Sequence, residues 1–344
     1  MATAQKIDTI KPIDRLGQIL AVGPVQLPNR VFLAPMSGVT DAPFRRRALD
    51  DGAGLVVSEM VASQEFVKGS AESRLRAQTD GLAVRMVQLA GREAHWMGEA
   101  AKMLEGAGVD IIDINMGCPA KKVTGGYSGS ALMRDLDHAM TLIEATVRAV
   151  SAPVTLKMRL GWDDGTINAP ELARRAVDAG VQMITVHGRT RCQFYNGSAD
   201  WAAIRAVRDA VSVPLVVNGD IHDMKSANEA LDRSGADAVM IGRAIYGQPW
   251  LAGALAKGEL ALPRDLARYI IAHYRDMIDH YGPTIGLRHA RKHLGWYLGR
   301  FAQDFDSGSK AQLMTLTDPQ EVVRIIADMD LAKSAVTAMR REAA

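Results

Sequence analysis

The sequence is poor in cysteine and has no long apolar stretch. Two cysteines in 344 residues, Cys118 and Cys192, are typical of a protein in a reducing compartment and leave no framework of disulfides. No apolar segment approaches the roughly 18 residues that a membrane span requires. Residues 1–22 mix acids with bases and are not expected to form a signal peptide. We therefore expect a cytoplasmic protein without a membrane segment.

The sequence also lacks a large excess of charge of either sign, and it lacks the glycine motif of dinucleotide-binding folds. The chain carries 41 Lys and Arg against 39 Asp and Glu, a net charge of +2, so any nucleic-acid surface must be a local patch. The first predicted strand ends in Ala-Pro-Met-Ser (34–37), without the GxGxxG fingerprint that a doubly wound sheet would carry there. No cluster of Cys and His has the spacing of metal ligands, so no metal site is predicted.

Eight strand-like segments alternate with helix-like segments along most of the chain. The predicted strands are 31–34, 55–58, 84–89, 111–115, 154–158, 183–187, 215–218 and 238–241. Intervening stretches such as 171–179 and 202–210 carry apolar residues at helical spacing. Strands that alternate with helices predict a parallel sheet, and eight such units favour a (β/α)8 TIM barrel.

The alternation stops at Gly-Gln-Pro-Trp (247–250), after which the pattern is purely helical. We predict an N-terminal arm over 1–22, a barrel over 23–251 that opens with a turn or hairpin at 23–30, an all-helical C-terminal domain over 252–330 and a tail over 331–344. Within the helical domain, residues 282–300 contain no acid and carry Arg288, Arg291, Lys292 and Arg300, which makes a local basic face.

The stretch 110–135 joins an apolar strand, a lone thiol and a glycine-rich loop. Cys118 closely follows the strand 111–115, and two lysines and several glycines come after it. A cysteine is most often a small buried hydrophobe. Here Gly117 and Pro119 flank it at the C-terminal end of a strand, where parallel α/β folds carry their chemistry, and this position favours an active-site thiol.

Chemically distinctive residues follow all eight predicted strands. In chain order they are Pro35, Met36 and Ser37; Glu59 and Met60; Gln88; Asn115 and Cys118; Lys157 and Arg159; His187 and Arg189; Asn218, Gly219 and Asp220; and Gly242 and Arg243. Each alone could cap a loop, but their coincidence predicts one site. The glycines after the last two strands, with Arg243, favour a phosphate site there, although tight turns would also require them.

Lys157 is predicted to be a buried cation, and an unpaired buried ammonium is costly. It could be a Schiff-base nucleophile, as in barrel aldolases, or a fixed charge beside a cofactor that becomes anionic when reduced. The aldolase hypothesis leaves Cys118 and its loop unused, so we favour the cofactor. Gln88, His187 and Asn218 would then surround the cofactor's ring, although His187 could equally be a satisfied core histidine.

Seven motifs resemble, in order along the chain, the tRNA-dihydrouridine synthases, and more narrowly their bacterial B-type branch. They are LAPMSGVTDAPFR (33–45), VQLAG (87–91), DINMGCPAKKVTGGYSGSALM (113–133), TLKMRLGW (155–162), ITVHGRTR (184–191), VNGDI (217–221) and MIGRAIYGQPW (240–250). A further segment, ARKHLGWYLG (290–299), is similar to the family's helical domain.

The resemblance implies a flavin-dependent oxidoreductase that reduces specific uridines in tRNA to 5,6-dihydrouridine, with FMN in the barrel and NADPH or NADH as a transient reductant. Hydride would pass from flavin N5 to uracil C6. The implied FMN contacts are Pro35, Met36 and Ser37 through backbone, Gln88 and Lys157 at the ring, and His187, Asn218, Gly219, Asp220, Gly242 and Arg243 at the ribityl chain and phosphate. Ser37 stands where the branch often has alanine.

The resemblance also implies contacts to the substrate. Cys118 would be the general acid that gives a proton to uracil C5, and Asn115 and Arg159 would hold the uracil. The implied tRNA-backbone contacts are Lys121, Lys122, Arg288, Arg291 and Lys292.

Three other functions stay open on the residues alone. One is an FMN-dependent TIM-barrel oxidoreductase for a free small molecule, of the dihydroorotate dehydrogenase or enoate type. The second is a Schiff-base aldolase at Lys157, and the third is a non-catalytic RNA-binding module that assists tRNA folding.

Overall fold

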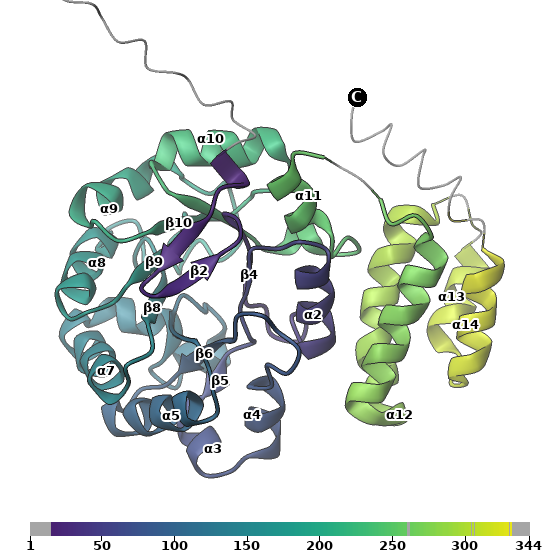
Figure 1. Ribbon diagram of the computed structural model, residues 1–344, viewed down its shortest axis with the longest axis horizontal. Helices are drawn as coiled ribbons and strands as arrows, with labels where there is room; N and C mark the ends of the chain where they lie inside the picture. Colours follow the sequence, from purple (N-terminus) through teal and green to yellow (C-terminus); the bar gives the residue numbers. More distant parts are fainter. Residues whose placement is uncertain (1–14, 260–261, 304, 306, 330, 332–344) are drawn as a thin grey trace, which may run out of the picture.

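The computed structural model describes residues 15–331, except 260, 261, 304, 306 and 330. A barrel of parallel strands wrapped by helices lies beside a smaller bundle of helices (Figure 1). The predicted fold, a TIM barrel followed by a helical C-terminal region, is confirmed. Residues 1–14 and 332–344 of the predicted arm and tail lie outside the described residues, and the domain boundaries stay predictions. No helix in the described part of the chain is long and apolar enough to cross a membrane.

The barrel closes through a strand that is present in two pieces. The hydrogen-bonded order is β4-β3-β11-β10-β9-β8-β7-β6-β5, and every neighbouring pair is parallel. The strands are β3 (Val31–Leu33), β4 (Leu55–Val56), β5 (Val61–Ala62), β6 (Met86–Ala90), β7 (Ile111–Met116), β8 (Val154–Arg159), β9 (Met183–His187), β10 (Leu215–Asn218) and β11 (Ala238–Ile241). Between β4 and β5, the Ser58 amide donates to the Met86 carbonyl at 3.2 Å, so residues 55–62 act as one barrel strand. The predicted strand 55–58 is therefore the first part of a longer, interrupted one.

Helices follow the strands and cover the outside of the barrel (Figure 1). They are α2 (Ala42–Asp50), α3 (Ser63–Val67), α4 (Ala71–Arg76), α5 (Ala94–Gly106), α7 (Leu136–Ala149), α8 (Ala169–Asp178), α9 (Arg205–Ala210), α10 (Met224–Ser234) and α11 (Leu251–Lys257), with the 3-10 turn η2 (Ala202–Ile204). The short helix α6 (Lys121–Thr124) and the 3-10 turns η1 (Gly129–Arg134) and η3 (Arg243–Ile245) belong to loops that follow β7 and β11. The outward-facing apolar side chains of the strands pack on the inner faces of these helices and form the main core.

A short hairpin closes one end of the barrel. Strands β1 (Leu20–Val22) and β2 (Val25–Leu27) pair antiparallel and lie across the barrel in Figure 1. Leu20, Val22 and Leu27 pack on the first inward-facing residues of the strands, such as Ile111 and Met183. Residues 20–22, predicted to belong to the arm, thus seal the N-terminal end of the barrel. The opposite end is left for a site.

The barrel interior becomes more polar toward the C-terminal ends of strands β6 to β10. Alternate residues of a strand point inward, and the inward series run Met86 then Gln88; Ile111 then Asp113 and Asn115; Thr155 then Lys157 and Arg159; Met183 then Thr185 and His187; and Val216 then Asn218. The C-terminal end of the barrel is therefore lined by polar and charged side chains.

The helical bundle consists of α12 (Leu266–Phe301), α13 (Ser307–Thr315) and α14 (Pro319–Asp328) around its own apolar core. The chain reverses within α12 at Gly282, whose φ of 76° is non-helical, and Pro283 begins the second half. The bundle packs on α2: the Phe44 ring lies 5.6 Å from the His273 ring and 5.4 Å from the His293 ring, measured between centroids. Arg47 and Asp276 form an ion pair of 2.5 Å across the same contact.

Candidate active site

A cavity of about 840 Å³ opens at the C-terminal ends of the barrel strands. All fourteen barrel residues predicted for cofactor, uracil or proton transfer line it: Pro35, Met36, Ser37, Gln88, Asn115, Cys118, Lys157, Arg159, His187, Asn218, Gly219, Asp220, Gly242 and Arg243. Residues more than two hundred positions apart in the sequence thus meet at one place, because the C-terminal ends of all eight strands converge there.

A relay of side-chain hydrogen bonds connects a buried carboxylate to the backbone of Cys118. Thr155 Oγ1 and Gln88 Nε2 each donate to Asp113 at 2.6 Å, and Asn115 Nδ2 donates to Gln88 Oε1 at 2.7 Å. Asn115 Oδ1 then accepts from the Cys118 amide at 3.1 Å. Burial raises the pKa of Asp113 to about 6, opposed by its bonds to Thr155 and Gln88. Because an ionised carboxylate only accepts, it fixes the orientation of both amides in the relay.

Lys157 points its ammonium group into the cavity wall. Its Nζ donates to Asn218 Oδ1 at 3.0 Å, and Asn218 Nδ2 in turn donates to the Met240 carbonyl at 2.9 Å. Burial lowers the pKa of Lys157 to about 8, with Asp113 opposing the change and Arg159 adding to it. The group is therefore mostly protonated at pH 7 and presents a fixed positive charge.

His187 is held neutral at the end of β9. Its pKa lies well below the ordinary value, because of burial and of the neighbouring cations Arg159 and Lys157. Gly219 packs directly against it: its φ is +116°, and a Cβ there would lie 2.8 Å from His187 Cδ2 and 2.8 Å from Ala199 Cβ. The backbone after β10 can therefore pass this close to the imidazole only as glycine.

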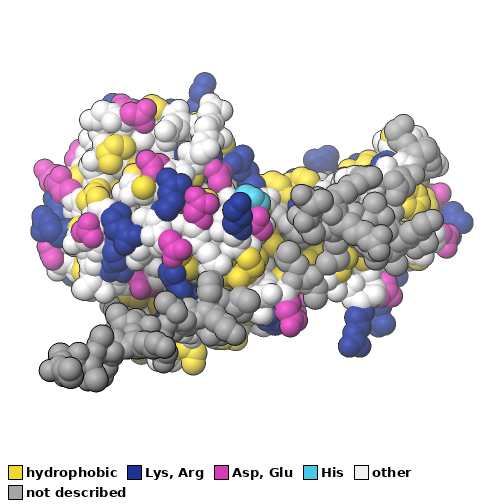
Figure 2. Space-filling model, turned by 90° about the horizontal axis from the view of Figure 1, so that it is seen from above, with side chains coloured by type: hydrophobic (Ala, Val, Ile, Leu, Met, Phe, Trp, Pro, Cys, Tyr) yellow, Lys and Arg dark blue, Asp and Glu magenta, His cyan; other side chains and the backbone are white. Residues whose placement is uncertain are grey.

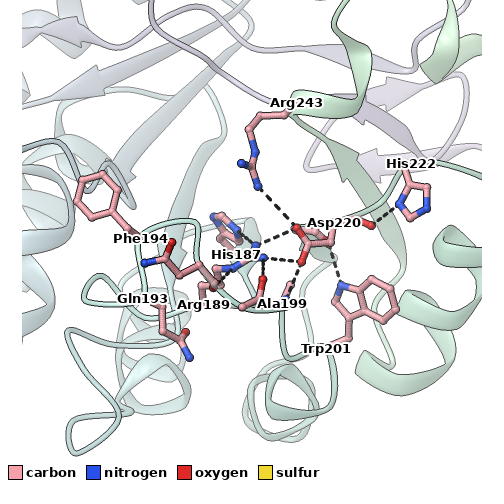
Figure 3. Close-up of polar contacts among 12 residues, drawn as sticks. His187, Arg189, Gln193, Phe194, Ala199, Trp201, Asp220, His222 and Arg243 are labelled. Atoms are coloured by element: carbon pink, nitrogen blue, oxygen red, sulfur yellow. Dashed lines mark hydrogen bonds and ion pairs between the residues drawn. The ribbon is translucent and has the colours of Figure 1, made fainter.

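Arg189 and Asp220 form the best-defined ion pair of the site (Figure 3). The guanidinium donates to both carboxylate oxygens, at 3.0 and 2.6 Å, and also to the carbonyls of Asn196 and Gly197. Burial would raise the pKa of Asp220, but the bonds from Arg189 outweigh it and the pKa is lowered. Arg243 lies 3.8 Å from the same carboxylate, with its guanidinium more exposed.

The thiol of Cys118 is free and half-buried at the start of the glycine-rich loop. The carbonyl of Cys118 accepts from the amide of Ser130 at 3.1 Å and from its hydroxyl at 2.9 Å, which ties the two ends of the loop together. Arg159 Nε donates to the Gly117 carbonyl at 2.8 Å, while its Nη1 donates to the carbonyls of Thr190 and Phe194. The backbone on either side of the thiol is thus anchored to strand β8 and to η1.

The residues predicted to contact tRNA phosphates have different surroundings. Lys121 and Arg288 are exposed, and the Lys122 side chain lies outside the described part of the structure. Arg291 instead donates to the carbonyls of Thr315 and Leu316 at the end of α13, and Lys292 Nζ donates to the carbonyl of Gly38. On the face in Figure 2, Lys and Arg side chains are interspersed with Asp and Glu over the barrel, and neither sign dominates.

Several residues of the site were not predicted. Asp113, the acceptor of the amide relay, could have been found from its inward register between Ile111 and Asn115 within an otherwise apolar strand. Phe194, Tyr195 and Tyr246 line the cavity mouth from loops that follow β9 and β11, where no periodic pattern marks them. No group of three or more His, Cys, Asp and Glu among the described residues is arranged to hold a metal ion.

Comparisons with known proteins agree on the family. The family model described as "Dihydrouridine synthase (Dus)" matches residues 32–337. The chain is 63% identical over 294 residues to a probable tRNA-dihydrouridine synthase of Rhizobium leguminosarum bv. phaseoli, covering 86% of this chain and 93% of that one. It is 47% identical over 291 residues to tRNA-dihydrouridine synthase B of Escherichia coli K12, covering 82% and 91%.

The fold is also similar to solved structures of low sequence identity. Morphinone reductase gives a TM-score of 0.51 at 16% identity, with 73% of this chain and 91% of that chain covered. Histamine dehydrogenase from Rhizobium sp. 4-9 gives 0.57 at 15% identity, with 77% and 51% covered. At these identities the likeness supports the barrel fold and nothing finer.

Proposed function

The chain belongs to the dihydrouridine synthase family, and on this basis we propose that it reduces uridines in tRNA to 5,6-dihydrouridine, with FMN in the barrel cavity and NADPH as reductant. The observation that carries the proposal is that the fourteen barrel residues expected for this chemistry all line one cavity. Because the substrate is tRNA, we place the reaction in the cytoplasm.

The residues of the cavity fit a flavin mononucleotide. The volume, about 840 Å³, lies in the range of cofactor pockets. At Gly242 an added Cβ would meet nothing closer than the Met36 sulfur at 3.9 Å, so the backbone there faces open space where a phosphate can approach. Lys157 would lie against the ring with Gln88, and Arg243 would bind the phosphate. FMN, when bound there, supplies the hydride for C6 of the uracil.

The protein's own part in the reaction is to position the base and to deliver a proton. Cys118 would donate the proton to uracil C5, and the anchored backbone on both sides of it would hold the sulfur over the cavity. Asn115 lines the cavity, and the second hydrogen of its NH2 group is not used by the relay, which suits it to donate to a carbonyl of the uracil. The target base must leave its stack to reach this depth, as in other enzymes that act on bases.

The RNA itself would be held by exposed cations on the glycine-rich loop and on the helical bundle. Lys121 lies on α6 within the glycine-rich loop, and Arg288 lies on the second half of α12. Contacts of this kind to phosphates give recognition by shape and a strong dependence on salt.

The test uses the full-length protein with its bound flavin. The flavin is reduced with NADPH under anaerobic conditions and then mixed with tRNA that lacks dihydrouridine, with free uridine or with dihydroorotate's oxidised partner, orotate. We expect reoxidation by tRNA together with dihydrouridine in the recovered RNA. Reoxidation by a free small molecule and not by tRNA would favour a barrel reductase of small molecules. A protein that binds no flavin would refute the proposal altogether.

A further inference from the structure

We propose that Lys292 is a positioning residue that clamps the first loop of the barrel, residues 34–41, and is not a contact to tRNA phosphate. The inference rests on the proposed function, because Pro35, Met36 and Ser37 in this loop are the proposed backbone contacts to FMN. The loop joins β3 to α2 and forms one wall of the cavity.

The loop is held from two sides at Gly38. Lys292 Nζ, from the helical bundle, donates to the Gly38 carbonyl, and the Gly38 amide donates to Glu59 Oε1, from the barrel. Next to it, the Met36 amide donates to Thr40 Oγ1 at 2.9 Å. Both polar groups of the Gly38 backbone are thus fixed by charged side chains, directly beside the residues that line the cavity.

The charges around the clamp show why Lys292 stays in this place. Asp41 and Glu59 are 2% and 4% exposed, and the Asp41 carboxylate accepts from the Phe44 amide at 3.0 Å and from the Tyr281 hydroxyl at 3.2 Å. Two nitrogens of the buried Arg45 donate to the backbone carbonyls of Thr40 and Gln78. Burial lowers the pKa of Lys292, and the charges of Asp41 and Glu59 oppose this change, so the ammonium lies within electrostatic reach of both carboxylates. Moving it to a phosphate would take a favourable positive charge away from two buried carboxylates, which is costly.

The same segment of α12 touches a second wall of the cavity. The Trp296 ring stacks on the Tyr246 ring with centroids 4.0 Å apart and planes 7° apart, and Lys292 Nζ lies 5.7 Å above the Trp296 ring. Tyr246 lines the cavity mouth. One turn of the bundle therefore bears on two cavity-lining segments, one after β3 and one after β11.

Arg288 provides the matched comparison, because it lies one helical turn before Lys292 on the same half of α12. It is exposed, and within the described residues it has no carboxylate partner. The two cations therefore make opposite predictions: Lys292 acts on the cofactor site, and Arg288 acts on the RNA.

The experiment measures two properties of the full-length holoprotein for Lys292→Met, Lys292→Arg and Arg288→Met. The first is the rate of FMN release on dilution, followed by the recovery of flavin fluorescence, together with the absorption spectrum of the bound flavin. The second is the slope of tRNA affinity against salt concentration. Lys292→Gln, a shorter neutral side chain, replaces Lys292→Met if that variant does not fold.

We expect Lys292→Met to release FMN about tenfold faster, as for the loss of one hydrogen bond from a charged donor, to shift the flavin spectrum, and to keep the wild-type salt slope. Lys292→Arg should restore most of the retention. Arg288→Met should release FMN as the wild type does and lower the salt slope by about one. Wild-type FMN release from Lys292→Met, or a salt slope lowered as much as in Arg288→Met, would overturn the inference. Absence of flavin from the wild type would instead refute the proposed function.

Discussion

Replacing Asp113 by asparagine tests the relay that connects the barrel interior to Cys118. The carboxylate accepts from both Gln88 and Thr155, whereas an asparagine side chain turns one donor toward them. If the new amide faces Gln88, the Gln88 amide must flip to accept from it. Asn115 must then flip as well, and its NH2 group would face the Cys118 amide, which is itself a donor. This orientation would disturb the cofactor wall and the backbone of the proposed proton donor together. In the other orientation the new NH2 group faces Thr155, whose hydroxyl can accept, and the relay keeps its directions.

The effect on stability follows from the pKa of this carboxyl. Its folded-state pKa of about 6 lies above the ordinary 3.8, so between these values the folded protein keeps a proton that the unfolded chain has released. The free energy of unfolding must therefore fall as pH rises through this window, by about 3 kcal/mol from this group alone. Asp113→Asn lacks this contribution. At pH 7 it avoids burying the charge but leaves one buried donor without an acceptor, at a cost of about 1–3 kcal/mol, so the two effects largely offset each other.

The assay compares wild type and Asp113→Asn by chemical denaturation from pH 4 to pH 7 and by FMN release and dihydrouridine formation at pH 7. Stability of the variant at pH 7 should be close to that of the wild type, while FMN release becomes faster and dihydrouridine formation falls. The wild type should lose stability from pH 4 to pH 6 relative to the variant. Asp113→Leu removes the acceptor for Gln88 altogether, and unchanged flavin retention and activity in that folded variant would show that the relay does not orient Gln88 and Asn115.

Three further changes test other parts of the site. Cys118→Ala should keep its flavin and lose dihydrouridine formation by roughly 10²–10⁴-fold, as for removal of a general acid, and mass spectrometry of the tRNA would detect full activity as a contradiction. FMN affinity of the wild type should fall above about pH 8, because Lys157 in the flavin-free protein loses its proton there. The fall should be absent in Lys157→Met, and release assays from pH 7 to pH 9.5 measure both proteins. Gly219→Ala should lower the free energy of unfolding by more than Gly197→Ala does. A Cβ at Gly219 would lie 2.8 Å from His187, whereas nothing lies within 4 Å of a Cβ at Gly197. Equal losses of unfolding free energy in the two variants, measured by chemical denaturation, would argue against the close packing.

Much of the barrel could be predicted because its strands are buried on both faces. Runs such as 183–187, 215–218 and 238–241 are nearly continuous in apolar residues, and the strands have those bounds. The site followed from the same pattern, since every strand's C-terminal end faces one opening. The second strand was predicted only in part, because its pairing changes from β3 to β6 at Ser58, and a change of partner leaves no mark on hydrophobic periodicity.

The roles of the basic segment 282–300 could not be separated in the sequence. Arg288, Arg291 and Lys292 look alike as cations on one helix, but which of them meets solvent depends on the reversal at Gly282 and on what packs against each helical face. Arg291 ends on backbone carbonyls and Lys292 on Gly38, both from segments far away in the chain. The sequence shows which charged residues share a helix face. Tertiary contacts decide which of them form hydrogen bonds within the protein and which face solvent.

The balance of charge in the cavity bears on the alternatives to a flavin. Cations outnumber carboxylates among the side chains in and around it: Lys157, Arg159, Arg189 and Arg243 stand against Asp113 and Asp220, with His187 neutral. The pKa of Lys157, lowered to about 8 by burial, would suit a Schiff-base lysine as well as a fixed charge, but a Schiff base at Lys157 gives no role to Cys118 and its loop. Arg189 is paired with Asp220, whereas the buried Lys157 and Arg159 donate only to neutral acceptors. A phosphate beside Arg243, and a ring beside Lys157 that becomes anionic when reduced, would balance this positive charge. The geometry therefore favours an anionic cofactor over an aldolase, and an enzyme over an RNA-binding module, which would have no use for this charge deep inside the barrel.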